Sequence, residues 1–235
     1  MTRFGRPHKH LTECASTNDI AREWALDPVD PAPSGALVTA DFQTRGRGQR
    51  GHEWQAGTGQ SALMSYVYRL PLDSHPAQLG LVTALAAAEV CRASNAYAQV
   101  KWPNDILLNG KKCAGILVEV AEGVAILGIG INVSQTEFTN ASAFAYPPTS
   151  LRLEDGDQQT VRRVIEGLNR SLDWWEEEWR RKGFVPIIER CRRCLAVGAV
   201  VRQGEVTAEL VGLTEEGGAQ VKLSDGTFAV WTTVN

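Results

Sequence analysis

The order of strand-like and helix-like segments constrains the fold of this chain more than any single motif. Some segments alternate apolar with polar residues or run apolar throughout, whereas others repeat apolar residues at helical spacing. The predicted strands are residues 35–42, 61–70, 97–101 and 123–133, and the predicted helices are residues 16–26, 75–94 and 160–182, with a short helix to about residue 194. Grouped strands with separate helices favour an α+β main domain, in which helices flank a mixed β-sheet.

The pattern changes from Val200 onward, where short alternating strands are separated by polar turns that contain Gly204, Gly217 and Gly226. About 40 residues cannot bury a large core of their own. We therefore predict a main domain of residues 1–194 and a small C-terminal β-barrel of residues 195–235 that leans on it.

Composition narrows the class of protein. The 235 residues are 43% apolar and 22% charged, as in an ordinary globular chain, and the net charge of −3 gives no general attraction to nucleic acid. No window approaches the roughly 20 apolar residues of a membrane span, and residues 1–10 lack the apolar core of a signal peptide. The five cysteines are an odd number, so we expect a cytoplasmic protein without disulfides. Cys191 and Cys194 are interpreted as a structural pair, and no metal site is predicted.

Residues 43–59, QTRGRGQRGHEWQAGTG, are too rich in glycine and charge for any regular element; we call them the Gly/Arg loop. Glycines let a backbone approach an anion closely, and arginines supply forked donors for carboxylate or phosphate. The loop is no Walker motif, because no GK[ST] follows it. A flexible basic surface loop would carry the same residues, so the loop alone leaves its function open.

A second motif, KWPND, follows a predicted strand at residues 101–105. Lys101 suits a point-charge role against an oxyanion, and Asn104 and Asp105 follow a rigid turn at Pro103. Asn and Asp are also ordinary turn formers. Downstream, Asn109-Gly110 predicts a tight hairpin; beyond it lie the further lysine and glycine of KKCAG (111–115) and the small residues and terminal amide of GIGIN (128–132).

One reaction would use these features together. Joining a carboxylate to the α-phosphate of ATP brings two anions into contact, so cationic donors must surround the reacting atoms. The mixed anhydride that forms is labile in water, and a loop that folds over it excludes solvent.

The same motifs, in this order, resemble the biotin protein ligase family nearly end to end. The matching pieces are STN (16–18), ADFQTRGRGQRGHEW (40–54), KWPNDILLNGKKCAGILVE (101–119), GIGINV (128–133) and GLTEEGGAQVKLSDG (212–226). The resemblance implies a class II synthetase-like catalytic domain followed by an SH3-like barrel. Only 15 residues precede Ser16, too few for the helix-turn-helix of repressor members, so we expect a stand-alone ligase that does not bind DNA.

The resemblance also implies the site residues. Catalytic roles fall to Lys101 and Arg47. The implied biotin-binding residues are Ser16, Thr17, Asn18, Gln43, Arg47, Gly48, Gln49, Lys101 and Gly115, and the implied ATP-binding residues are Arg47, Asn104, Asp105, Lys112 and Asn132. Gly115 also borders the nucleotide side.

The implied reaction has two steps. Biotin and ATP, with Mg²⁺ on the phosphates, give biotinyl-5′-AMP and pyrophosphate. A lysine of a biotin carboxyl-carrier domain of an acyl-CoA carboxylase then attacks the acyl carbon and releases AMP. An exposed strand edge could also support a homodimer.

The chain departs from the common form of the family loop, G-R-G-R-x-G-R-x-W, at two positions. Gln49 and His52 stand where that form has arginines, and Arg50 could substitute for one of them. We hypothesise that the loss weakens retention of the adenylate by ~1–3 kcal/mol per charged hydrogen bond. The last strand, FAVWTTVN, also lacks the usual GEV ending.

Three alternatives stay open on the sequence. A lipoate or octanoate ligase shares the general architecture but not the combination of Gly/Arg loop and KWPND. A biotin-binding module without ligase activity would fit Gln49 and His52, and it would bind biotin without releasing pyrophosphate. A purely structural β-barrel partner would leave both motifs unexplained.

Overall fold

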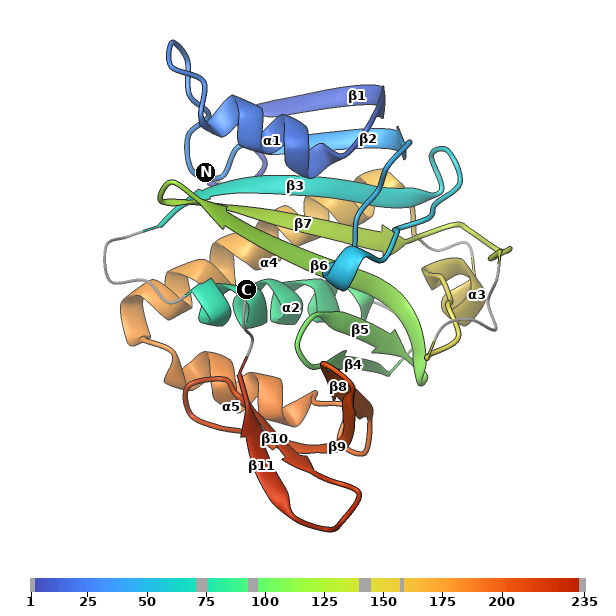
Figure 1. Cartoon of the computed structure of the whole chain (residues 1–235). Coiled ribbons are helices and arrows are strands. Elements are labelled where there is room, and N and C mark those ends of the chain that lie inside the picture. The colour runs from blue at the N-terminus through green and yellow to red at the C-terminus, as the bar shows by residue number, and fades with distance from the viewer. Residues whose placement is uncertain (1–2, 71–75, 93–96, 140–144, 157–158, 233–235) are drawn as a thin grey trace.

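The computed structural model describes residues 3–70, 76–92, 97–139, 145–156 and 159–232, and a seven-stranded sheet forms its centre (Figure 1). The strands lie in the order β1-β2-β3-β7-β6-β5-β4. β1 runs parallel to β2, and all other neighbours are antiparallel. The bounds are β1 His8–Cys14, β2 Leu37–Gln43, β3 Ser61–Arg69, β4 Ala98–Lys101, β5 Asp105–Leu108, β6 Lys111–Ala121 and β7 Val124–Asn132. The predicted mixed sheet in an α+β fold is confirmed.

The sequence pattern does not predict β1. This strand lies at the edge of the sheet and five of its seven residues are exposed, so it shows no clean apolar alternation. The predicted hairpin between β5 and β6 is confirmed, because Asn109 and Gly110 have φ angles of 49° and 79°. Positive φ at both central residues is what a type I′ turn requires.

The helices cover the two faces of the sheet unequally (Figure 1). Their bounds are α1 Thr17–Ala25, η1 Gln49–Gly51, α2 Pro76–Cys91, α3 Leu151–Asp155, α4 Val161–Lys182 and α5 Val185–Arg193. α2 and α4 lie against one face and bury it within the main core. α1 packs on the other face through Ala21 and Ala25, over a small cluster that includes Val124 and Ile126 of β7. The rest of that face, toward the end of β7, is left for the cavity described below.

The long helix α4 begins and ends where the sequence predicts. Thr160 caps it by accepting a hydrogen bond from the backbone N–H of Arg163, and Gly183 follows it with a φ of 74°. Six of its apolar residues recur at helical spacing; Leu168, Leu172 and Trp175 are buried, whereas Val161, Ile165 and Trp179 are partly buried. For α2, the predicted ends His75 and Ser94 lie outside the described residues.

The C-terminal strands form a separate four-stranded antiparallel sheet in the order β11-β10-β9-β8. The bounds are β8 Val200–Gln203, β9 Val206–Leu213, β10 Ala219–Lys222 and β11 Phe228–Trp231. Its inner residues, among them Leu210 and Val221, belong to the same apolar core as α2, α4 and α5. The division of the chain between residues 194 and 195 stays a prediction.

Two smaller expectations can be placed in this fold. Cys191 and Cys194 are free and buried, and burial raises the pKa of the Cys191 thiol, as expected of a structural pair. Within the part of the chain that the structure describes, no helix is long and apolar enough to cross a membrane.

Candidate functional site

A cavity of about 840 Å³ lies between the uncovered part of the seven-stranded sheet, the Gly/Arg loop and the start of the C-terminal sheet. Every residue that the sequence analysis assigned to the site lines it. These are Ser16, Thr17, Asn18, Gln43, Arg47, Gly48, Gln49, Lys101, Asn104, Asp105, Lys112, Gly115 and Asn132. The fold therefore gathers motifs from five separate segments into one space, while their individual roles stay predictions.

One end of the cavity holds an uncharged network of four side chains, which we call the amide network: Thr17, Asn18, Gln43 and Ser65. Gln43 Oε1 accepts hydrogen bonds from the backbone N–H of Thr17 at 2.7 Å and from its hydroxyl at 2.9 Å. Ser65 Oγ lies 2.7 Å from Thr17 Oγ1 and 2.5 Å from Asn18 Oδ1. Because Thr17, Asn18 and Ser65 are buried, these bonds fix their orientation.

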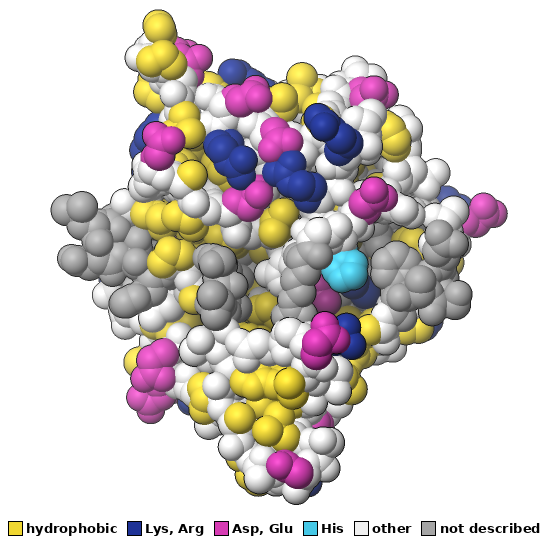
Figure 2. Space-filling model, in the orientation of Figure 1, with side chains coloured by type: hydrophobic (Ala, Val, Ile, Leu, Met, Phe, Trp, Pro, Cys, Tyr) yellow, Lys and Arg dark blue, Asp and Glu magenta, His cyan; other side chains and the backbone are white. Residues whose placement is uncertain are grey.

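The amide network continues into a charged cluster above α1, which we call the ion cluster: Asp19, Arg22, Arg47 and Glu119. Arg47 donates two parallel hydrogen bonds to Asp19, at 2.7 and 2.8 Å, and lies 3.2 Å from Glu119 Oε2. The hydrogen bond from Arg47 lowers the pKa of Asp19, and the same bond with the charge of Glu119 raises the pKa of Arg47. Figure 2 shows acidic and basic side chains next to one another over this part of the molecule.

Trp54 lies across the middle of the cavity floor. A Cβ on Gly130 would be 2.5 Å from the Trp54 ring, and one on Gly115 would be 2.9 Å from it. The two glycines are directly paired between β6 and β7, so together they make a flat floor on which the indole lies. The indole Nε1 is buried and has no hydrogen-bond partner among the described residues. Gly115 and Gly130 are therefore needed because any larger residue would keep the Trp54 ring away from the sheet.

The other end of the cavity holds two cations around one carboxylate, which we call the lysine pair: Lys101 and Lys112 with Asp105. Lys101 Nζ lies 3.3 Å from Asp105 Oδ2, and Lys112 Nζ lies 2.6 Å from Asp105 Oδ1. Lys101 and Asp105 are about equally shielded, with side chains 13% and 12% exposed. The Tyr146 ring lies 5.3 Å from Lys101 Nζ, within range of a cation–π contact.

Each of the two asparagines at this end uses one side-chain N–H for a hydrogen bond within the protein. Asn104 Nδ2 donates to the carbonyl of Ile116 at 3.0 Å, and Asn132 Nδ2 donates to the carbonyl of Thr149 at 2.9 Å. Both side chains thus hold neighbouring segments in place around the lysine pair. Whether they also contact a nucleotide stays a prediction.

The Gly/Arg loop is more regular than the sequence suggests. The backbone N–H of Trp54 bonds to the carbonyl of Gly46 at 2.9 Å, and that of Gly48 bonds to the carbonyl of His52 at 2.6 Å. Gln49 begins the single turn of η1 at the tip. The prediction of no regular element is therefore wrong for this part, because glycines allow the chain to fold back on itself despite the dense charge.

Sequence reasoning missed several residues of the site. Ser65 comes from the middle of a predicted strand, and Glu119 is the last residue of the matched stretch 101–119, near the end of β6. In each case a polar residue within an apolar run was the available signal. Trp54 stands at the end of the GHEW stretch but was given no role. The cavity is also lined by Val200 and Arg202 of β8, so the C-terminal sheet contributes to the site.

The two ends suit different parts of one ligand. The amide network offers hydrogen bonds without net charge, which fits a neutral polar ring system. The lysine pair leaves one positive charge in excess over Asp105, which fits an anion. In the described part of the chain, no group of three His, Cys, Asp or Glu side chains could hold a metal ion.

The chain is similar to proteins of one enzyme family. Residues 13–135 match the biotin/lipoate A/B protein ligase family. A biotin–[acetyl-CoA-carboxylase] ligase of Paracoccus denitrificans is 34% identical over 87% of this chain and 88% of its own length. The bifunctional ligase/repressor BirA of Bacillus subtilis is 31% identical over 93% of this chain and 70% of its own. The solved biotin protein ligase of Aquifex aeolicus in complex with biotin and ATP has a TM-score of 0.81 at 26% identity, and the match covers 97% of this chain and 100% of that one.

Proposed function

The chain belongs to the biotin/lipoate A/B protein ligase family, and we propose that it activates biotin with ATP and transfers it to a lysine of a carrier protein. It is an AMP-forming ligase. The observation that carries the proposal is the single cavity with an uncharged amide network at one end and the lysine pair at the other. A ligand with a neutral polar ring and a distant carboxylate would bind across both ends.

The first step joins the biotin carboxylate to the α-phosphorus of ATP and releases pyrophosphate. Biotin would place its ureido group on the amide network and its carboxylate near Lys101. Lys101 and Lys112 reduce the repulsion between the carboxylate and the phosphate, and they stabilise the charge that grows on the phosphate oxygens. Asp105, which contacts both ammonium groups, holds them at fixed positions. Magnesium would enter with ATP, held mainly by phosphate oxygens and water, which requires no cluster of protein ligands.

The second step transfers the acyl group. The carrier lysine, as a neutral amine, attacks the acyl carbon of biotinyl-5′-AMP, and AMP leaves with the electrons of the broken C–O bond. The Gly/Arg loop, which includes Trp54, lines one side of the cavity and would help to exclude water that hydrolyses the anhydride. The carrier we propose is a biotin carboxyl-carrier domain of an acyl-CoA carboxylase. A cytoplasmic location fits a reaction that consumes ATP, and homodimer formation stays a prediction.

Pyrophosphate release tests the proposal directly. Purified protein is mixed with ATP and Mg²⁺ and either biotin or lipoate, and we expect release with biotin alone. Release with lipoate alone would instead favour the lipoate ligase that belongs to the same family. If neither acid gives pyrophosphate release but calorimetry shows biotin binding, the result would contradict ligase activity and favour a biotin-binding module.

A further inference from the structure

We propose that Glu119 is a positioning residue for the ring end of the acid substrate, because it sets the orientation of the Asn18 amide and ties that amide to Arg47. The inference rests on the proposed function and deepens it. None of the sequence motifs singles out Glu119, which lies near the end of β6.

Glu119 of β6 contacts two residues of α1, Asn18 and Arg22, and Arg47 of the Gly/Arg loop. Its Oε2 accepts a hydrogen bond from Asn18 Nδ2 at 2.6 Å and lies 3.1 Å from Arg22 and 3.2 Å from Arg47. Its side chain is 27% exposed, so the contacts are partly shielded from water. On β6, Glu119 is four residues beyond Gly115, or about 13 Å along the strand. It therefore acts at the amide network and not at the lysine pair.

A carboxylate fixes the direction of an amide because it only accepts hydrogen bonds. Asn18 must turn its NH₂ group toward Glu119, and its carbonyl then faces Ser65 Oγ, 2.5 Å away. The absence of a side chain at Gly128 is necessary, since a Cβ there would lie 2.4 Å from Asn18 Oδ1. One N–H and one lone pair of the Asn18 amide remain for a ligand. Glu119 determines which side of the amide presents the N–H and which presents the oxygen.

The same carboxylate places Arg47. Asp19 takes two guanidinium N–H groups of Arg47, and Glu119 lies against the same guanidinium from β6. With Arg22, the ion cluster contains two carboxylates and two guanidiniums, so its formal charges cancel. An uncharged partner at position 119 would leave the cluster with an excess positive charge beside Asn18.

A purely structural ion cluster is the alternative explanation. Partly exposed pairs of this kind contribute only about 0–1 kcal/mol to stability. Such a role would change the melting temperature and would affect biotin and ATP alike. A positioning role predicts that the effect falls on biotin and becomes smaller when Asn18 is absent.

The test is a double-mutant cycle of Asn18→Ala and Glu119→Gln, with Glu23→Gln as a control on the exposed side of α1. Biotin affinity is measured by calorimetry, and the KM values for biotin and ATP are measured by pyrophosphate release. We expect Glu119→Gln to weaken biotin binding about tenfold, as the loss of a charged hydrogen bond implies, and to leave the ATP KM within about twofold. In the Asn18→Ala background, the same change should have a clearly smaller effect, and the remainder is the part that acts through Arg47.

The outcomes separate the two proposals. Additive effects of the two substitutions, or equal rises in both KM values, would overturn the role of Glu119. Wild-type protein that binds biotin but releases no pyrophosphate would contradict ligase activity, and the calorimetric cycle would still decide the role of Glu119. Wild-type protein that does not bind biotin would contradict both. If Glu119→Gln does not fold, Glu119→Asp, which keeps the carboxylate but withdraws it by one methylene, replaces it in the cycle with a smaller expected loss.

Discussion

The two ends of the cavity are built in different ways. The lysine pair comes from one short stretch of sequence, since β4, a tight turn and the β5–β6 hairpin bring Lys101, Asp105 and Lys112 together. The amide network and the ion cluster are assembled from four segments, namely α1, the Gly/Arg loop with the end of β2, β3, and β6. In the proposed function, a local motif would thus supply the charge for the reaction, whereas the site for the ring is assembled from distant parts of the chain.

The ends also differ in burial and in charge. Lys101 and Asp105 have side chains 13% and 12% exposed, whereas Arg47 and Asp19 have side chains 37% and 33% exposed. A charge acts more strongly where water is excluded, so the same loss of one cation should cost more at the lysine pair. The ion cluster moreover balances its own charges, whereas the lysine pair keeps an excess. We therefore expect the lysine pair to control the rate and the amide network to control biotin affinity.

Lys101→Ala should have the largest effect. Removing a cation beside the reacting oxygens is expected to lower kcat for adenylation about 100- to 1000-fold. Biotin affinity should fall much less, because the amide network that binds the ring is intact. Pyrophosphate release and biotin calorimetry measure the two quantities, with the exposed Lys222→Ala of β10 as the control. Unchanged turnover in Lys101→Ala would contradict the assigned role of Lys101 and the expectation that the lysine pair controls the rate.

Sequence reasoning reached the two ends to different extents. All three residues of the lysine pair were named from the sequence, because they lie in one short stretch, 101–119, that resembles the family; the chemistry of KWPND alone left its function open. At the other end sequence reasoning found Thr17, Asn18, Gln43 and Arg47 but not Ser65 or Glu119. Neither residue lines the cavity itself; they lie behind Thr17, Asn18 and Arg47, and only the pairing of β3, β6 and β7 brings them to these side chains.

The fold shows the same division. Helices with caps and glycine stops, such as α4, and the Asn109–Gly110 hairpin follow from local rules and were predicted. β1 was missed because an exposed edge strand needs little apolar surface and leaves almost no pattern. The regular part of the Gly/Arg loop was missed because its backbone bonds are made across a few residues that are rich in glycine.

Arg47→Ala should have the next largest effect, at the opposite end. We expect biotin and the adenylate to bind about 10- to 30-fold more weakly, as for a lost charged pair, with a smaller change for ATP, because Arg47 lies with Asn18 and Glu119 and not with the lysine pair. Calorimetry with each ligand measures this, and Arg162→Ala on the surface of α4 serves as the control. A larger loss for ATP than for biotin would reverse the assignment of Arg47.

Gln49→Arg adds a positive charge to the cavity at the tip of the Gly/Arg loop. A restored charged hydrogen bond of roughly 1–3 kcal/mol should slow dissociation of biotinyl-5′-AMP by about tenfold, and biotin affinity should change less. Rapid filtration or stopped-flow measurement of adenylate dissociation compares the variant with the wild type. Equal rates would count against the hypothesis that Gln49 makes this ligase lose its intermediate.

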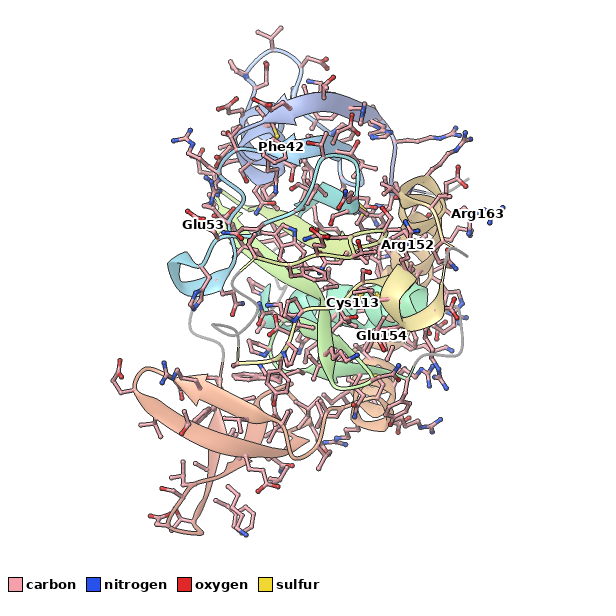
Figure 3. The ribbon with its side chains drawn as sticks, turned by 90° about the vertical axis from the view of Figure 1, so that its right-hand side faces the viewer. Phe42, Glu53, Cys113, Arg152, Glu154 and Arg163 are labelled. Atoms are coloured by element: carbon pink, nitrogen blue, oxygen red, sulfur yellow. The ribbon has the colours of Figure 1, made fainter. Side chains whose placement is uncertain are left out.

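Glu154→Gln is a smaller test of the lysine pair, acting from outside the cavity. Glu154 on α3 binds Lys111 at 3.0 Å, Thr149 at 2.6 Å and Asn109 at 2.8 Å, and so holds the β5–β6 hairpin beside Lys112. Figure 3 shows Glu154 near Cys113, the residue that follows Lys112, and away from Glu53 of the loop. We expect the ATP KM to rise about threefold, as for a weakened ion pair, with unchanged biotin affinity. A rise in the KM for biotin alone would contradict the expectation that Glu154 supports the lysine pair.

The smallest expected effect concerns the acid dependence of the ion cluster. The hydrogen bond from Arg47 lowers the pKa of Asp19 below its value in the unfolded chain, which is about 3.9. A group whose pKa is lowered on folding stabilises the native state above its unfolded pKa, and this contribution is lost as the pH falls through the lowered folded value. The contribution of Asp19 should therefore be constant across the neutral range and decline only in acid.

Urea unfolding of the wild type and of Asp19→Asn at about pH 7, 5 and 3 measures this contribution as the difference between their free energies of unfolding. We expect the same difference at the two higher pH values and a smaller one at about pH 3, where the Asp19 carboxylate begins to take up its proton in the unfolded chain first. Asp30→Asn, an exposed aspartate in the turn after α1, is the control and should show no such difference. A difference that already becomes smaller between pH 7 and 5 would mean that Arg47 does not hold Asp19. The ion cluster would then not fix the position of Arg47, and the contrast between the two ends depends on that position.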